Sequence, residues 1–70
     1  MKLSARNQLK GTIVNIDDGA VNAIVKIKIS SGDIVSATIS KDAVRELKLT
    51  VGAEAYAIIK ATSVMVAIDD

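Results

Sequence analysis

The segment Ser-Ala-Arg-Asn-Gln-Leu-Lys-Gly, residues 4–11, holds the densest run of hydrogen-bond donors in the chain. Ser4, Arg6 and Asn7 offer a hydroxyl, a guanidinium and an amide, and no carboxylate lies among them. A cationic cluster that is rich in donors and free of acids suits an anion. A solvated chain terminus is the alternative interpretation, and the residues of this segment alone leave both open.

A second donor-rich segment, Lys-Ala-Thr-Ser at residues 60–63, interrupts two predicted strands. Small residues such as Ala61 let a ligand approach backbone N–H groups, which form anion-binding concavities without needing charge. Lys60 adds a point charge, and Arg6 adds a planar fork of donors suited to oxyanions. An ordinary turn is the alternative here. An oxyanion site made of donors is one interpretation of the two segments together. A frayed N-terminus and an ordinary turn are the other, and the residues alone favour the latter.

The titratable residues of the chain give little support to a catalytic function. The chain has no His and no Cys, and it has 8 acidic residues, most of them in predicted turns, on the predicted helix or at the C-terminal end. Asp17 and Asp18 form an adjacent pair of carboxylates, but Asp-Asp-Gly at residues 17–19 is more typical of a turn. There is no glycine-rich phosphate loop of the known kinds. We therefore predict a protein that is not an enzyme, has no cofactor and offers no direct protein ligands to a metal.

Length and charge narrow the class of protein. The 70 residues predict one domain, residues 1–70. Because 9 basic residues face 8 acidic ones, the charge is too balanced for bulk attraction to nucleic acid. No signal peptide or transmembrane run is present, so we expect a soluble, cytoplasmic protein without a membrane partner. Without cysteines, and with an apolar content made mostly of Val, Ile and Ala, the chain is predicted to self-associate for stability.

The sequence predicts five short strands, from β-branched residues in the first and from alternation of apolar and polar residues in the second, third and fourth. A change of period after the third strand predicts one short helix before the fourth. This order predicts an all-β, five-stranded, OB-like Greek-key barrel. The predicted strands cover residues 10–16, 20–30, 34–39, 53–60 and 64–68, and the predicted helix covers residues 40–48.

Particular residues refine this outline. Gly11 inside a strand suggests a bulge or a close approach of another backbone. Ser40 is placed to cap the helix N-terminus, and Val44 and Leu47 share one helical face. Asp69 and Asp70 are predicted to form a solvated tail.

An OB-like barrel also raises a nucleic-acid alternative. Such barrels bind single strands by stacking bases on aromatic side chains beside basic residues. Here Tyr56 is the single aromatic residue, and no aromatic interleaves with Lys26 or Lys28. The stacking platform is missing, so we predict no nucleic-acid partner.

A third interpretation is a purely structural assembly module, in which the donor cluster of residues 4–11 makes contacts between subunits.

Three segments, residues 4–11, 21–23 and 59–64, resemble the molbindin (Mop) family of small cytoplasmic molybdate-binding proteins. The resemblance covers essentially the whole chain. It implies storage or homeostasis of molybdate, and of tungstate, which is nearly isosteric. It also implies a homohexamer, arranged as a trimer of dimers, with the oxyanion bound between subunits.

The resemblance further implies which residues hold the oxyanion. Ser40 matches a site hydroxyl in related domains, besides its expected role as a helix cap. The positions implied are Ser4, Arg6, Asn7, Asn22, Ser40, Lys60, Ala61 and Ser63.

The chemistry of such a donor set favours molybdate. Molybdate is a dianion that is fully deprotonated at neutral pH, so it only accepts hydrogen bonds. Phosphate carries a proton that a donor-only site leaves unpaired, at a cost of about 1–3 kcal/mol. Sulfate is unprotonated as well, and we expect its exclusion to depend on size alone.

Overall fold

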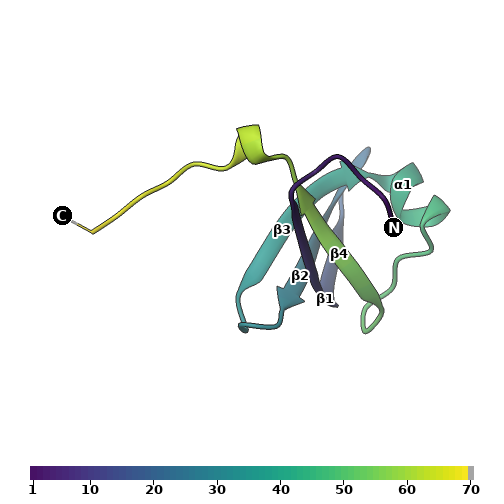
Figure 1. The fold of residues 1–70 in the computed structure, drawn as a ribbon. Coiled ribbons are helices and arrows are strands. Elements are labelled where there is room, and N and C mark those ends of the chain that lie inside the picture. The colour runs from purple at the N-terminus through teal and green to yellow at the C-terminus, as the bar shows by residue number, and fades with distance from the viewer. Residues whose placement is uncertain (70) are drawn as a thin grey trace.

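A computed structural model describes residues 1–69 of the chain, which form a curled antiparallel sheet with one short helix (Figure 1). Within these residues the sheet has four strands in the order β3-β2-β1-β4, so β1 pairs with both β2 and β4. The elements are β1 Asn7–Asp18, β2 Asn22–Ile29, β3 Ile34–Ser40, α1 Lys41–Glu46, β4 Glu54–Ile59 and the 3-10 turn η1 Ala61–Ser63.

The first strand, β1, is longer than predicted and contains a bulge. Its register against β2 shifts between Ile13 and Asn15, which leaves Val14 as the extra residue of a bulge. A bulge bends a strand and increases its twist. The bent β1 pairs with β2 on one side and with β4 on the other. Gly11, where we predicted a bulge or a close approach, shows the close approach: a Cβ there would lie 2.4 Å from the carbonyl oxygen of Lys28.

The hydrophobic core lies on the concave side of the sheet, where the alternation predicted it. Ile13 and Val25 are the largest fully buried side chains, and Ile27 and Ala57 complete the buried cluster. Val21 is the exception to the predicted apolar face, since it precedes β2 and is 74% exposed. The odd positions of β3 and β4 are half-buried or buried, as predicted.

The helix is shorter than predicted, and Ser40 caps it. The Ser40 Oγ accepts a hydrogen bond from the Ala43 N–H at 3.0 Å. Val44 packs against the core, whereas Leu47, which we expected on the same face, is 66% exposed. The reason is that Leu47 is the C-terminal cap, where the chain leaves the helix and turns.

The end of α1 is a Schellman motif with a lysine at its left-handed position. The Leu49 N–H bonds to the Val44 carbonyl at 3.0 Å, and the Lys48 N–H bonds to the Arg45 carbonyl at 3.1 Å. Lys48 therefore has a φ of 53°, a region that disfavours residues with a Cβ by about 1–2 kcal/mol.

We expect Lys48→Gly to raise the free energy of unfolding by about 1 kcal/mol, since glycine adopts this conformation without steric cost. Urea denaturation at one fixed protein concentration measures the effect. Ala43→Gly is the matched control: it places glycine in the middle of α1, where about 1 kcal/mol of stability should be lost. An unchanged or lowered midpoint for Lys48→Gly would contradict the prediction.

The predicted fifth strand does not form in the part of the chain that the structure describes. After β4, Lys60 leads into η1, and residues 64–68 then run away from the sheet in an extended course (Figure 1). We call residues 64–68 the C-terminal arm. Asp69 is exposed, as predicted, and Asp70 lies outside the described residues.

Within residues 1–69 no helix is long and apolar enough to cross a bilayer.

Candidate oxyanion-binding site

The two donor-rich segments meet in one shallow pocket of about 230 Å³. It lies beside the start of β1 and the end of β4, which pair antiparallel with Asn7 opposite Ile59. The residues just before β1 and just after β4 therefore lie side by side. The lining residues are Ser4, Ala5, Arg6, Lys60, Ala61 and Thr62.

Hydrogen bonds from β1 hold the two walls of this pocket. The half-buried Asn7 donates from Nδ2 to the Ile59 carbonyl at 3.2 Å, directly before Lys60. Gln8 donates from Nε2 to the Ala5 carbonyl at 3.2 Å, which ties the N-terminal wall to β1. Asn7 was predicted as a binding residue, but it does not line the pocket. Its side chain instead holds the end of β4 through the hydrogen bond to Ile59.

Two positively charged side chains, Arg6 and Lys60, line the pocket. Arg6 and Lys60 are both exposed, and neither forms an ion pair within residues 1–69. Among residues 1–69, no acidic residue lines the pocket. Two uncompensated cations beside small and hydroxyl side chains attract an anion and supply it with donors.

The turn η1 adds backbone donors and one hydroxyl that sequence reasoning did not select. The N–H groups of Ser63 and Val64 bond back to Lys60 and Ala61, at 2.9 and 3.3 Å, whereas those of Ala61 and Thr62 make no hydrogen bond within the described residues. Thr62 lines the pocket, and Ser63, the predicted residue, does not. The sequence pattern gave no sign of a 3-10 turn here, and the type of turn decides which of the two neighbouring hydroxyl residues faces the pocket.

Two other predicted residues lie elsewhere on the chain. Asn22 and Ser40 pair with each other across β2 and β3, and neither lines the pocket. Asn22 borders a depression with Asp17 and Asp18, and the Ser40 hydroxyl is engaged as the cap of α1. A single chain therefore brings together Ser4, Arg6, Lys60 and Ala61, and leaves Asn22 and Ser40 apart from them.

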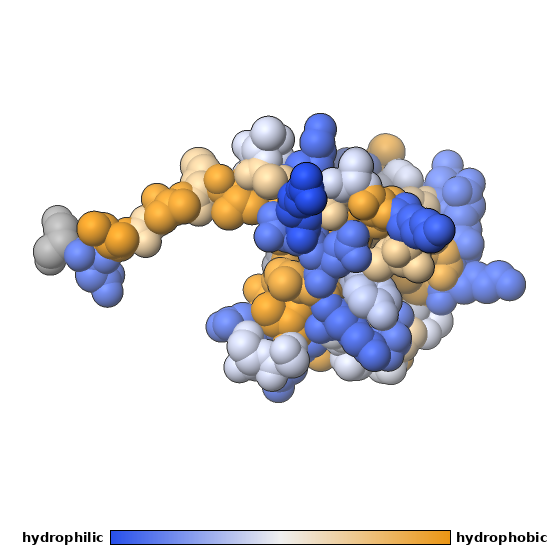
Figure 2. Space-filling model, viewed as in Figure 1, coloured by the Kyte–Doolittle hydropathy of each residue, from blue (hydrophilic) through white to orange (hydrophobic). Residues whose placement is uncertain are grey.

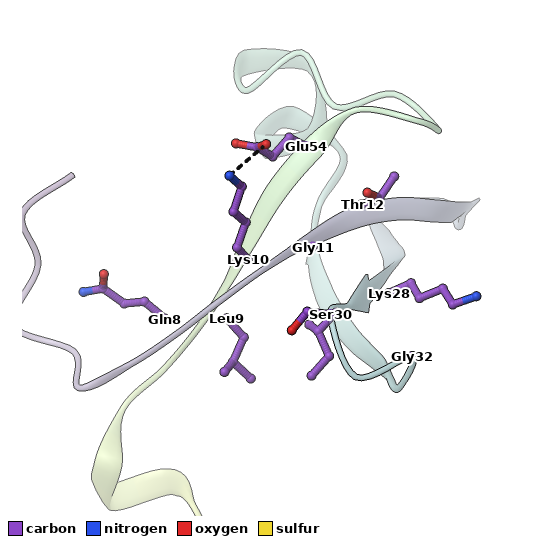
Figure 3. A pocket seen from close by; sticks show the side chains of 10 residues that line it. Gln8, Leu9, Lys10, Gly11, Thr12, Lys28, Ser30, Gly32 and Glu54 are labelled. Carbon is purple, nitrogen blue, oxygen red and sulfur yellow. Dashed lines mark ion pairs between the residues drawn. The ribbon is translucent and has the colours of Figure 1, made fainter.

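The largest depression of the described surface is a poorer anion site. Its volume is about 710 Å³, and it lies over β1 and the β2–β3 turn (Figure 3). Glu54 and Lys10 point toward one another across it and form an ion pair of 3.4 Å. The lysine charge is thus compensated, and the carboxylate repels a second anion.

Comparison with known proteins identifies a family model and close relatives. The TOBE domain model matches residues 3–66. A probable molybdenum-pterin-binding protein of Haemophilus influenzae is 64% identical over 69 residues, which cover 99% of this chain and 100% of the relative.

Two solved structures resemble the chain in fold as well as in sequence. A molybdate-binding protein from Sporomusa ovata matches with a TM-score of 0.91 and 35% identity, over 97% of this chain and 100% of that one. The cytoplasmic molybdate-binding protein ModG, solved with molybdate bound, matches with a TM-score of 0.84 and 48% identity. That match covers 87% of this chain and 43% of the ModG chain.

Proposed function

The chain belongs to the TOBE domain family as a molbindin-type (Mop) protein, and we propose that it binds molybdate in the pocket between the start of β1 and η1. The observation that carries this proposal is that Arg6 and Lys60 both line a pocket whose lining, in the part of the chain that the structure describes, includes no acidic residue. The relatives with solved structures bind molybdate, and the donor set present here suits the same ligand.

Each lining residue has a distinct role in this proposal. Arg6 contributes a planar fork of donors to two oxygens of the anion, and Lys60 contributes a point charge. Ser4 and Thr62 supply hydroxyls. Ala61 leaves room for the anion to approach the free N–H groups of η1.

We further propose that a second copy of the chain completes the site. The pocket is shallow and open, and only Ala5 among its lining residues is even half-buried, so one chain cannot enclose an anion. Asn22 and Ser40, which lie apart from the pocket of their own chain, would supply further donors to the pocket of a neighbour. The proposed assembly is a homohexamer built as a trimer of dimers.

The proposed biological role is storage and homeostasis of molybdate in the cytoplasm, without catalysis and without a cofactor. Tungstate is nearly isosteric with molybdate and is expected to bind in the same way. Single-stranded nucleic acid is not favoured, since Tyr56 is the one aromatic residue that could stack with a base.

Isothermal titration with molybdate tests the proposal. We expect saturable binding of molybdate and tungstate, and at least tenfold weaker binding of phosphate, because no carboxylate among the described lining residues accepts its proton. A ligand that binds the folded state should also raise the melting temperature, by an amount that grows with the logarithm of 1 + L/Kd, where L is the free ligand concentration. Absence of binding, verified by equilibrium dialysis, would refute the proposal. Tight binding of an oligonucleotide at moderate salt in its place would favour the nucleic-acid alternative.

A further inference from the structure

Few contacts determine how far apart the two walls of the oxyanion pocket lie. The first wall is residues 4–6, which precede β1, and the second wall is residues 60–62, which follow β4. Asn7 and Ile59 are the last pair of the β1–β4 ladder, and within residues 1–69 no backbone hydrogen bond joins one wall to the other. Figure 2 shows the junction of these segments as a hydrophilic area beside the largely hydrophobic C-terminal arm. The separation of the walls therefore depends on the contacts at their roots.

Two neighbouring amide side chains of β1 form those contacts. Gln8 donates from Nε2 to the carbonyl of Ala5, the middle residue of the first wall, at 3.2 Å, and this bond fixes the first wall to β1. Asn7 donates from Nδ2 to the Ile59 carbonyl at 3.2 Å, directly before the second wall. Asn7 is half-buried, so water competes less for its bond than for that of the exposed Gln8. The first wall thus follows β1, and Asn7 determines where the second wall begins relative to it.

The separation of the walls matters because two anions of equal charge compete for such a pocket. Molybdate and sulfate are both tetrahedral dianions without a proton, so charge and donor type do not tell them apart. Sulfate is smaller, because its bonds from the central atom to oxygen are shorter. Donors held at a spacing that suits molybdate make long, weak hydrogen bonds to sulfate, whereas walls that can approach one another fit both anions. Discrimination is a difference between two affinities, and here it requires a fixed spacing.

We infer that Asn7 is a positioning residue that sets the selectivity of the pocket for molybdate over sulfate. Its side chain does not line the pocket, and its amide nitrogen bonds to the Ile59 carbonyl, so it acts through the backbone of β4 and not by contact with the anion. Arg6 and Lys60, which adjoin Asn7 and Ile59 in the chain, are thereby held at a fixed separation. The inference rests on the proposed function and extends it from affinity to the choice between two dianions.

The test is the ratio of the Kd for sulfate to the Kd for molybdate. Isothermal titration measures both values, with competition against molybdate where sulfate alone gives too little heat. Asn7→Asp keeps the shape of the side chain and removes the amide donor. Its added negative charge acts on the two dianions alike and cancels in the ratio. We expect the ratio to fall about tenfold, the order of one hydrogen bond, because the released second wall can close on sulfate.

Two further variants make the result specific to the hydrogen bond. Asn15→Asp is the matched control, since Asn15 is exposed on β1 and does not line the pocket, and it should keep the wild-type ratio. Asn7→Leu covers the case in which Asn7→Asp fails to fold. It removes the donor without adding a charge, and leucine suits a half-buried position. We expect the same fall in the ratio for Asn7→Leu as for Asn7→Asp.

Several results would overturn the inference and leave the proposed function intact. A wild-type ratio in the Asn7 variants, with both Kd values raised by the same factor, would make Asn7 a direct ligand of the anion. A lowered melting temperature of the ligand-free protein with an unchanged ratio, or failure of both Asn7 variants to fold, would leave Asn7 a role in fold stability alone. An equal fall in Asn15→Asp, or a wild type that binds both anions equally, would also overturn it. A wild type that binds no molybdate would instead refute the proposed function, and this inference with it.

Discussion

Replacement of Arg6 by alanine is expected to weaken molybdate binding about 10- to 100-fold. Hydrogen bonds to charged groups contribute about 1.5–3 kcal/mol each, and every 1.4 kcal/mol changes Kd tenfold. Arg6 is exposed and forms no ion pair within residues 1–69, so its removal should leave the fold intact. Arg6→Lys retains the charge without the planar fork and is expected to bind with intermediate affinity. Isothermal titration measures all three proteins.

A lysine outside the pocket separates a local effect from a change in net charge. Lys26 is exposed on β2 and lines none of the depressions described above. Lys26→Ala removes one positive charge, as Arg6→Ala does, and should leave Kd almost unchanged, because Lys26 does not line the pocket and salt weakens the interactions of exposed charges. Wild-type affinity in Arg6→Ala would contradict the assignment of the pocket. Equal loss in Lys26→Ala would instead indicate nonspecific attraction.

Replacement of Ile13 by alanine is expected to lower the free energy of unfolding by about 2–5 kcal/mol. The Ile13 side chain is 0% exposed and packs in the cluster with Val25 and Ile27, so its truncation removes buried area and leaves a cavity. A domain of this size has about 4–10 kcal/mol of stability in total. The variant should therefore be close to unfolded at moderate temperature, which urea denaturation at fixed protein concentration will show.

The adjacent residue provides the control for this substitution. Val14 is 41% exposed at the bulge of β1, although it is as apolar as its neighbour. Val14→Ala should cost less than Ile13→Ala, because Val14 buries less surface than Ile13 and its truncation leaves no enclosed cavity. Similar losses at both positions would mean that strand propensity of β1, rather than packing in the core, determines the effect.

The sequence by itself determined the local structure. Alternation located four strands and their inward faces, since side chains of a strand point to opposite sides in turn. Ser40 was identified as the helix cap and Gly11 as a site of close backbone approach, because each follows from the chemistry of one residue and its neighbours. The absence of acids among residues 4–11 and 60–63 likewise predicted the chemistry of the pocket.

The tertiary structure decided which distant segments meet. The antiparallel pairing of β1 with β4 brings Ser4 and Arg6 beside Lys60, and no local pattern specifies that pairing. It also places the Asn7 amide, which was predicted to bind the oxyanion, in a hydrogen bond to the Ile59 carbonyl. The apolar character of residues 64–68 was visible in the sequence, but a strand exists only where an edge accepts its hydrogen bonds. Periodicity shows which face of a segment is apolar, and only the packed chain shows what lies against that face.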